Sequence, residues 1–431
     1  MPDILYTPLA APSRTALPRL RVAMVTESYP PEVNGVANSV ARIVDGLRAR
    51  DHTVQLVRPR QSHETMADGR GAIDEIRTTG MQIPLYGQLR MGLPAKKRLC
   101  QAWTLQRPDI VHIATEGLLG WSALQAARAL ELPVCSDFRT NFHAYSQFYR
   151  LGWLRRPIMG YLRHFHNHCH STMVPTEALQ QQLAASGLRS LSVVARGVDT
   201  RLFTPARRSA ALRQQWGVGE DGLIVLHVGR LAPEKNLGVV MRAFDSIRNI
   251  RPHARLVMVG DGPSRATMQA RHPQVIFTGF RVGEDLAMHY ASSDMFLFPS
   301  LTETYGNVTP EAMASGLAMV AFDDAAAGQL IHHGIDGLLA RKPDVADFVL
   351  CATDLSANRH WRQAMGTAAR VRVVDLGWDA IVDRIEGVYA GTICSAHTPI
   401  LWSASGLTAD ALAAQLKGVQ AHSHRSGVAA S

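Results

Sequence analysis

The feature that most constrains the fold is a regular alternation of short, apolar, β-rich runs with helix-length segments along most of the 431-residue chain. This alternation is typical of parallel sheets with helices on both faces. In the first half we predict strands at residues 21–26, 53–58, 110–114, 132–138, 171–176 and 191–196. In the second half we predict them at 223–229, 255–260, 275–279, 295–300, 318–322 and 337–340. The pattern predicts an α/β fold with two doubly wound domains.

The domain limits follow from the break between these two sets of strands. The expected first domain covers residues 20–200 and the second residues 206–391, with the linker near 198–208. Residues 392–431 are rich in Ala, Ser, Gly and His without a clear period, so we expect a weakly ordered tail. The cleft between two such domains is the default ligand site.

The bulk composition fits this organisation. Apolar residues make up 46% of the chain and charged residues 19%, as in a globular protein of this length. The first 20 residues lack the pattern of a signal peptide, and no apolar run reaches the roughly 18 residues that a membrane span needs. We therefore expect a cytoplasmic protein. Five scattered cysteines without a CxxC pair indicate neither a disulfide framework nor a zinc site.

The net charge of +9 is unevenly distributed. Residues 1–205 contain 24 Lys and Arg against 15 Asp and Glu, whereas the remainder is balanced at 21 against 21. A one-sided basic excess indicates an anionic partner, which could be a phospholipid surface, a nucleic acid or an acidic substrate.

Two carboxylates flank a loop in the stretch "ETYGNVTPE", which follows the predicted strand at 295–300. Thr309, Pro310 and Glu311 fit the N-cap, N1 and N2 positions of a helix, so Glu303 lies in the loop and Glu311 at the helix start. Ionised carboxylates only accept hydrogen bonds, and two spaced acceptors suit a polyol. The alternative is that Glu311 complements the helix dipole and Glu303 is merely solvated.

A basic loop follows the predicted strand at 223–229 in the stretch "HVGRLAPEKN". A diphosphate could rest there on backbone N–H groups near Gly229, with Arg230 and Lys235 as cations around it. The alternative is that both are surface charges. Neither a Walker lysine motif nor GxGxxG occurs, so the common nucleotide fingerprints are missing.

Other strand ends complete the expected pocket. Gly35 lies between the first strand and the first helix, where a glycine lets backbone approach a phosphate, although it could also be an ordinary turn glycine. The loops that hold Gly262 and Arg281 could cradle a base and ribose, and Phe280 offers a packing face.

The chain resembles a known family. "GRLAPEKN", "VGDGP", "FTGF" and "PSLTETYGNVTPEAMASG" are similar to the donor-binding domain of glycosyltransferase family 4 enzymes, which have the GT-B fold of two Rossmann-like domains facing across a cleft. "VTESYPPEVNGVANSV" and "RTNFHAYSQFYRLGWL" resemble the branch that glycosylates lipids, including mannosyltransferases and bacterial diacylglycerol glycosyltransferases. The resemblance covers roughly residues 20–390.

The resemblance implies roles for the residues above. Glu303 would contact the transferred sugar, Glu311 the ribose, and Arg230 with Lys235 the diphosphate of a UDP- or GDP-linked sugar. The remaining donor-binding residues would be Gly35, Gly229, Gly262, Phe280, Arg281, Tyr305, Gly306, Asn307 and Val308. The family retains anomeric configuration, and its leaving phosphate is thought to assist the acceptor hydroxyl. We expect no cofactor and no metal requirement, since the chain contains no D-x-D triplet.

One residue departs from the family pattern. Related enzymes often have His where this chain has Arg139, close to the reacting sugar. Arg cannot serve as a base at neutral pH, so we expect an electrostatic role on a phosphate or an acidic sugar. His143 could replace the missing histidine, although a packed or solvated loop histidine is the alternative.

An aromatic and basic stretch at residues 149–170 contains Trp153, Arg155 and Arg156, which we predict to contact an acceptor lipid at an anionic membrane surface. The alternative is a packed helix pair with a solvated basic face. The cluster of His164, His166, His168, Cys169 and His170 lacks a spaced partner group, so we predict no metal site there.

Three other functions stay open at this point. A nucleotide-sugar 2-epimerase shares the fold but needs further acid and base groups in the cleft. A non-catalytic nucleotide-sugar binding protein would not need both glutamates and both cations. A nucleic-acid binder would spread basic residues and stacking aromatics along a groove, whereas the basic, aromatic stretch here is local, so no nucleic-acid partner is expected.

Overall fold

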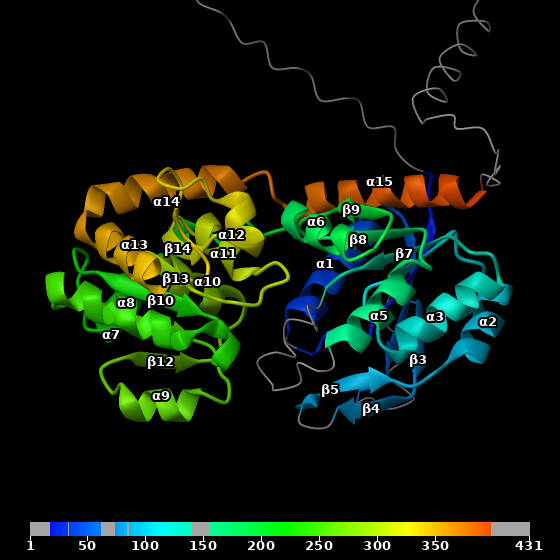
Figure 1. Cartoon of the computed structure of the whole chain (residues 1–431), viewed down its shortest axis with the longest axis horizontal. Helices are drawn as coiled ribbons and strands as arrows, with labels where there is room; N and C mark the ends of the chain where they lie inside the picture. The colour runs from blue at the N-terminus through cyan, green and yellow to red at the C-terminus, as the bar shows by residue number, and fades with distance from the viewer. Residues whose placement is uncertain (1–17, 33, 62–73, 84–85, 140–154, 398–431) are drawn as a thin grey trace, which may run out of the picture.

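In the computed structural model, the described part of the chain comprises residues 18–32, 34–61, 74–83, 86–139 and 155–397 (Figure 1). It forms two α/β domains, each built on one parallel sheet.

The sheet of the first domain has seven parallel strands in the order β3-β2-β1-β6-β7-β8-β9. The strands are β1 (Arg21–Val25), β2 (Thr53–Pro59), β3 (Asp74–Thr78), β6 (Ile110–Ile113), β7 (Val134–Asp137), β8 (Ser171–Val174) and β9 (Leu191–Val193). The connecting helices are α1 (Gly35–Arg48), α2 (Lys96–Leu105), α3 (Leu118–Ala129), α5 (Arg155–His166) and α6 (Glu177–Ala185). An antiparallel pair, β4 (Gly80–Ile83) and β5 (Tyr86–Gly92), lies beside this sheet.

The sheet of the second domain has six parallel strands in the order β12-β11-β10-β13-β14-β15. The strands are β10 (Ile224–Val228), β11 (Arg255–Val259), β12 (Ile276–Gly279), β13 (Met295–Phe298), β14 (Ala318–Phe322) and β15 (Leu338–Ala340). The helices are α7 (Ala210–Gln215), α8 (Leu237–Ile250), α9 (Arg265–Arg271), α10 (Gly283–Ala291), α11 (Val308–Ala314), α12 (Ala325–Leu330), α13 (Val345–Ala357) and α14 (Arg359–Val373). This is the strand order of a doubly wound, Rossmann-like sheet.

All twelve strands predicted from the sequence are present, with ends that differ by a few residues at most. The central strands β10 and β13 are buried along their whole length, because helices cover both faces of the sheet. The sequence pattern missed β3, β4 and β5, which lie at the edge of the first domain and contain many polar residues.

Helix α1 shows how the sequence fixes the local structure. The Asn34 side chain accepts hydrogen bonds from the backbone N–H groups of Val36 and Ala37, which caps the helix. Residues spaced by three and four positions, including Val40 and Val44, form its buried face. The helix therefore starts at the carboxyl end of β1, facing the expected ligand side.

The last helix, α15 (Trp378–His397), corrects the expected domain limits. We predicted that residues up to 391 belong to the second domain, but α15 returns to the first and packs on α1 (Figure 1). The contact is close, because a Cβ atom at Gly46 would lie only 2.6 Å from Val382. The reason is the apolar stripe of α15, which is buried against the first domain and comprises Ile381, Val382, Ile385 and Tyr389.

Residues 392–397, which we predicted to belong to the tail, are instead part of α15, and Thr392 contacts Ser171 through their hydroxyl groups at 2.7 Å. The rest of the expected tail lies outside the described residues. The expected boundary between residues 200 and 206 stays a prediction. Among the described helices, none combines the length and the apolar character needed to cross a membrane.

Candidate functional site

The strand order of the second sheet reverses between β10 and β13. In open α/β sheets, ligands bind outside the carboxyl ends of the strands at such a reversal, because the loops on either side diverge there. The loop after β10 holds Arg230 and Lys235, and the loop after β13 holds Glu303. The topology thus brings these predicted residues to one place.

Lys235 and Glu303 form an ion pair between Lys235 Nζ and Glu303 Oε1. The Ser300 hydroxyl donates a second hydrogen bond to the same carboxylate oxygen at 2.6 Å. Lys235 Nζ also lies 5.6 Å from the centre of the Phe298 ring. Because both charged side chains are only 13% exposed, the pair sits in a largely desolvated setting, where charges interact more strongly than in water.

Arg230 lies on the same loop as Lys235 and is more open to solvent. Its Nη1 is 3.7 Å from Glu234 Oε1, and its side chain is 43% exposed, whereas that of Glu234 is 2% exposed. The Glu234 backbone carbonyl accepts a hydrogen bond from the Leu301 N–H at 3.2 Å, which ties the two loops together. Arg230 can therefore reach an anionic ligand while the loop that carries it stays fixed.

Glycine residues allow the loops after β10 and β11 to pack backbone to backbone. Gly262 has φ +158°, and a Cβ atom there would lie 2.4 Å from the Leu231 carbonyl oxygen. The Leu231 N–H in turn donates to the Asp261 carbonyl at 2.9 Å. Gly229 also has a positive φ, of 153°. Both predicted glycines are thus needed for the shape of the loops. Their predicted contact with the donor stays a prediction.

Glu311 lies in the first turn of α11, two residues further into the helix than we expected. The helix starts at Val308 with Asn307 at the N-cap, so the predicted cap at Thr309 is wrong. Pro310 does not break the helix, because N–H groups of the first turn have no intrahelical partner. Burial raises the pKa of Glu311 to about 7, although a hydrogen bond from the Tyr290 hydroxyl at 3.0 Å opposes the shift.

Two further predicted donor-side residues, Phe280 and Arg281, follow the end of β12. Phe280 is 56% exposed, so its ring face is open to a ligand. Arg281 donates from Nη1 to Asp285 Oδ2 at 3.0 Å and from Nη2 to the Thr278 carbonyl at 2.9 Å. Neither residue contacts the Lys235–Glu303 pair within the described part of the chain.

Two contacts join the loop after β13 to the first domain. The Tyr305 hydroxyl donates to the Arg196 carbonyl at 3.3 Å, and Tyr305 is only 2% exposed. A Cβ atom at Gly35 would lie 3.5 Å from Asn307 Nδ2. The start of α1 and the loop with Gly306 therefore face each other, and the binding of a phosphate near Gly35 stays a prediction.

Arg139 is buried at the carboxyl end of β7 and paired with Asp137, to which its Nε donates at 2.7 Å. His112 Nε2 lies 3.0 Å from the same carboxylate oxygen, and His112 Nδ1 lies 2.7 Å from the Tyr389 hydroxyl of α15. Although burial raises the pKa of Asp137, the guanidinium of Arg139 and the ring of His112 hold it below its usual value. Arg139 therefore has a fixed position set by side chains from three elements.

A second pair of acids lies where the strand order of the first sheet reverses, between β1 and β6. Glu27 Oε1 accepts a hydrogen bond from the Leu119 N–H at 3.0 Å, and burial raises its pKa to about 7. Burial also raises the pKa of Glu116, to about 8. Both carboxyl groups can thus be protonated near neutral pH.

Comparison with known proteins identifies the family. The model for "Glycosyltransferase Family 4" matches residues 33–202, and that for "Glycosyl transferases group 1" matches residues 222–358. A GDP-mannose-dependent alpha-mannosyltransferase of Mycobacterium tuberculosis is 35% identical over 86% of this chain and 96% of its own length. The chain belongs to glycosyltransferase family 4. The Arabidopsis thaliana sulfoquinovosyl transferase is 30% identical to this glycosyltransferase over 88% of this chain and 75% of its own length.

Solved structures place the glycosyltransferase in the GT-B fold. Sucrose-phosphate synthase from Thermosynechococcus elongatus superposes with a TM-score of 0.71 at 19% identity, over 88% of this chain and all of that one. Anabaena HepE in complex with UDP and glucose superposes with a TM-score of 0.68 at 18% identity, over 86% of this chain and all of that one. The predicted fold of two Rossmann-like domains is thus confirmed.

The structure of the glycosyltransferase leaves part of the predicted acceptor side unassigned. Trp153 and His143 lie outside the described residues. Arg155 begins α5, and Arg156 is exposed on that helix. Within the part of the chain that the structure describes, no group of three or more His, Cys, Asp or Glu residues could hold a metal ion.

Sequence reasoning missed several residues of the glycosyltransferase that the structure brings to these sites, notably Ser300, Tyr290, Asp137 and Arg196. Asp137 could have been found, because residues two apart on a strand point to the same face and Arg139 follows at that spacing. Arg196 had no such signal, since only the fold brings it close to Tyr305.

Proposed function

We propose that this glycosyltransferase transfers a hexosyl group from a nucleotide-diphosphate sugar to a hydroxyl of a membrane lipid, with retention of anomeric configuration. The observation that carries the proposal is the constellation of Lys235, Arg230, Glu303 and Glu311 around the strand reversal of the second domain. Two cations suit a diphosphate, and two carboxylates suit the hydroxyls of a sugar and a ribose.

In the proposed reaction, the bond between the anomeric carbon and the diphosphate oxygen breaks while the acceptor oxygen bonds to that carbon. The acceptor's proton passes to the departing phosphate. Negative charge grows on that phosphate, so cations fixed in a desolvated loop stabilise the transition state more than the ground state. Lys235 and Arg230 would supply this charge, which is why we propose that no metal ion is required.

Relatives that act on lipids support a lipid acceptor. One relative is the GDP-mannose-dependent alpha-(1-6)-phosphatidylinositol monomannoside mannosyltransferase of Mycobacterium tuberculosis, 27% identical over 86% of this chain and 98% of its own length. Another is the alpha-monoglucosyldiacylglycerol synthase of Acholeplasma laidlawii, 25% identical over 75% of this chain and 85% of its own length. We accordingly propose a UDP- or GDP-linked donor, peripheral membrane association and a diacylglycerol- or phosphatidylinositol-type acceptor.

The test is a transfer assay. The purified protein is incubated with GDP-mannose or UDP-glucose and vesicles containing diacylglycerol or phosphatidylinositol, and lipids are analysed by mass spectrometry with and without EDTA. We expect a lipid heavier by one hexose, in equal amount with EDTA, and none with Glu303→Gln. Epimerised nucleotide sugar without a lipid product would favour an epimerase, and unchanged donor with tight nucleotide binding would favour a non-catalytic binding protein.

A further inference from the structure

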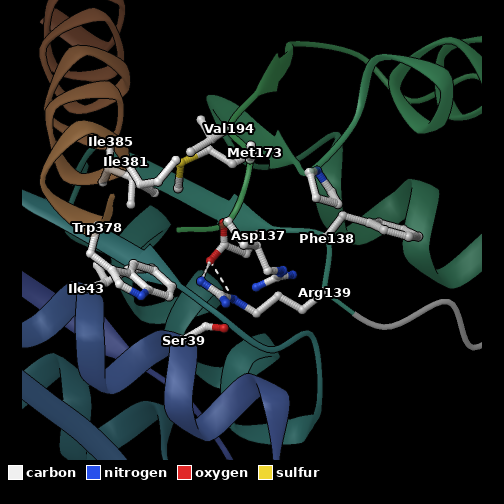
Figure 2. Close-up of a pocket in the computed structure, with 13 residues that line it drawn as sticks. Ser39, Ile43, Asp137, Phe138, Arg139, Met173, Val194, Trp378, Ile381 and Ile385 are labelled. Carbon is white, nitrogen blue, oxygen red and sulfur yellow. Dashed lines mark hydrogen bonds and ion pairs between the residues drawn. The ribbon is translucent and has the colours of Figure 1, made fainter. Parts of the chain in front are cut away.

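A pocket in the first domain lies at the carboxyl ends of β7 and β8 and is closed on one side by α15 (Figure 2). Its enclosed space is small, about 20 Å³, which is room for little more than one water-sized group, and the rest of the pocket is open to solvent. Polar and charged side chains form one part of its lining, namely Ser39, Asp137, Arg139 and Arg196. Apolar side chains form most of the rest, including Ile43, Met173, Val194, Trp378, Ile381 and Ile385.

The positive and negative charges of the side chains that line this pocket do not cancel. Among the described residues, Asp137 is the one acid of the lining, and its lowered pKa keeps it ionised. Two guanidinium groups face it, those of Arg139 and Arg196. Burial, and then the nearby charge of Arg139, lower the pKa of Arg196 to about 9, so it still carries its proton at neutral pH. The lining therefore has one positive charge in excess.

Hydrogen bonding is also incomplete at the two arginines. Arg139 is only 6% exposed, and its Nη1 has no hydrogen-bond partner among the described residues. The Arg196 guanidinium makes no hydrogen bond within the described part of the chain, although the backbone carbonyl of Arg196 accepts one from Tyr305. Asp137 is the counter-ion of both guanidinium groups, so one carboxylate faces two cations, and an oxyanion that accepts hydrogen bonds from their remaining N–H groups would balance the second cation.

The apolar side chains of the lining indicate which kind of ligand the pocket suits. Trp378, Ile381 and Ile385 come from α15 and lie across the pocket from Arg139 (Figure 2). Apolar surface gains free energy when it is covered by an apolar group. The pocket therefore suits a carboxylate, phosphate or sulfonate attached to an apolar stem, rather than a free polar sugar.

We infer that Arg139 and Arg196 form an oxyanion-binding pocket, which recognises an acidic group on one of the two substrates. The inference that an oxyanion binds here depends only on the pocket. The inference that this oxyanion belongs to a substrate rests on the proposed function. The Tyr305–Arg196 contact places the pocket next to the loop that carries Glu303 and Gly306. The acidic group can therefore belong to the acceptor or to the transferred sugar, and the experiments separate these two sources.

The first experiment measures binding of butyl phosphate by titration calorimetry, with butanol as the uncharged control. Nucleoside diphosphate is added at saturation, so that the cations of the second domain are occupied. We expect Arg196→Gln to weaken binding about tenfold or more, from the loss of a charge-assisted hydrogen bond. Arg196→Lys should keep part of the affinity for butyl phosphate, because lysine keeps the positive charge.

The matched control is Arg128→Gln, which removes a positive charge from an exposed position in the last turn of α3 in the same domain. We expect it to bind butyl phosphate as the wild type does. If the wild type and Arg196→Gln bind butyl phosphate with equal affinity, and circular dichroism shows that both are folded, the inference of an oxyanion-binding pocket is wrong. If no nucleoside diphosphate binds, the proposed function fails, while a titration without nucleotide still tests the pocket.

The second experiment identifies the source of the acidic group by steady-state kinetics. If the acceptor carries it, Arg196→Gln should raise KM for vesicles with phosphatidic acid but not for those with diacylglycerol. If the sugar carries it, the variant should weaken competition by UDP-glucuronic acid but not by UDP-glucose. Either result supports the pocket, and equal effects on charged and neutral members of both pairs would contradict its substrate role.

Discussion

At the scale of single residues, the direct contact between Lys235 and Glu303 is the most informative feature of the donor site. The two residues are 68 positions apart and belong to loops after different strands, yet they share one ion pair. A donor diphosphate would compete with Glu303 for Lys235, which would free the carboxylate to accept hydrogen bonds from the sugar. Binding of the donor and orientation of the sugar would therefore be linked through this pair.

We expect Lys235→Met to lower kcat by about a hundredfold and to change KM for the donor much less, because the charge that Lys235 meets grows as the bond breaks. Steady-state kinetics measures both constants. The control is Lys342→Met, which removes another lysine of the second domain that pairs with an acid, Asp324. A loss confined to KM, or an equal loss in the control, would argue against the assigned role.

The raised pKa of Glu311 predicts how nucleotide affinity depends on pH. Ionised Glu311 accepts hydrogen bonds from ribose hydroxyls better than the neutral acid, so affinity for the nucleoside diphosphate should rise as pH increases through about 7. Tyr290→Phe removes the hydrogen bond that lowers this pKa, so the midpoint should move to higher pH. Calorimetry between about pH 6 and pH 9 measures the midpoint.

Glu311→Gln is the matched variant for this titration and should weaken affinity and abolish its pH dependence. Glu303→Gln should leave the affinity for the nucleoside diphosphate nearly unchanged, because Glu303 is assigned to the sugar. Equal losses of nucleotide affinity in both variants would contradict the assignment of Glu311 to the ribose and Glu303 to the sugar.

Glu116 predicts a pH dependence of stability. Its folded-state pKa of about 8 exceeds the ordinary value of 4.5, so its stabilising effect is complete below about pH 4.5 and is lost as pH rises toward and through 8. In that window one such group contributes a slope of up to about 1.4 kcal/mol per pH unit to the unfolding free energy.

The isosteric Glu116→Gln removes the titrating group. Urea denaturation at about pH 5 and pH 8 should show a smaller loss of unfolding free energy for this variant than for the wild type. The same pH dependence in both proteins would mean that Glu116 stays ionised in the fold.

At the scale of elements, α15 makes the first domain depend on the end of the chain. Its Tyr389 contacts His112, and its Asp383 accepts a hydrogen bond from Arg50 Nη2 at 3.1 Å. The sequence indicates an amphipathic helix here but not the sheet it covers, because an apolar stripe fits any apolar surface of suitable shape. The same limit explains why the start of α11 was misplaced: Pro310 is compatible with several positions in a first turn.

Helix α5 carries the prediction about the membrane. Replacing Arg155 and Arg156 with Ala should weaken binding to anionic vesicles by about 2 kcal/mol, since each cation near such a surface contributes about 1 kcal/mol. The attraction is screened over about 10 Å at 0.1 M salt, so wild-type binding should also fall as salt rises. Vesicle cosedimentation measures both effects.

Removing Arg107 and Arg128 instead is the matched control, because it lowers the charge of the first domain by the same amount. We expect the control to bind like the wild type, and donor hydrolysis in solution to stay unchanged in both variants. If the variant without Arg155 and Arg156 binds the vesicles as the wild type does, these arginines do not contact the membrane and belong to a solvated helix face.

At the scale of the whole molecule, the alternation of strands and helices was sufficient to predict two doubly wound domains, because periodicity and turn residues repeat at every unit. The sequence also placed Glu303, Lys235 and Arg230 in loops after predicted strands, and parallel strands bring such loops to one edge of the sheet, but the strand order that makes these loops neighbours came only from the structure. What could not be predicted depends on contacts between distant segments, such as Arg196 beside Tyr305 or Tyr389 beside His112.

Our central proposal is that the second domain holds a nucleotide sugar and passes its sugar to a hydroxyl with retention. The most direct test is NMR of the glycolipid formed from an α-linked nucleotide sugar on acceptor-containing vesicles. We expect an α-linked product with the wild type and Lys342→Met, and at most traces with Lys235→Met. A β-linked product, or equal product from all three proteins, would contradict it.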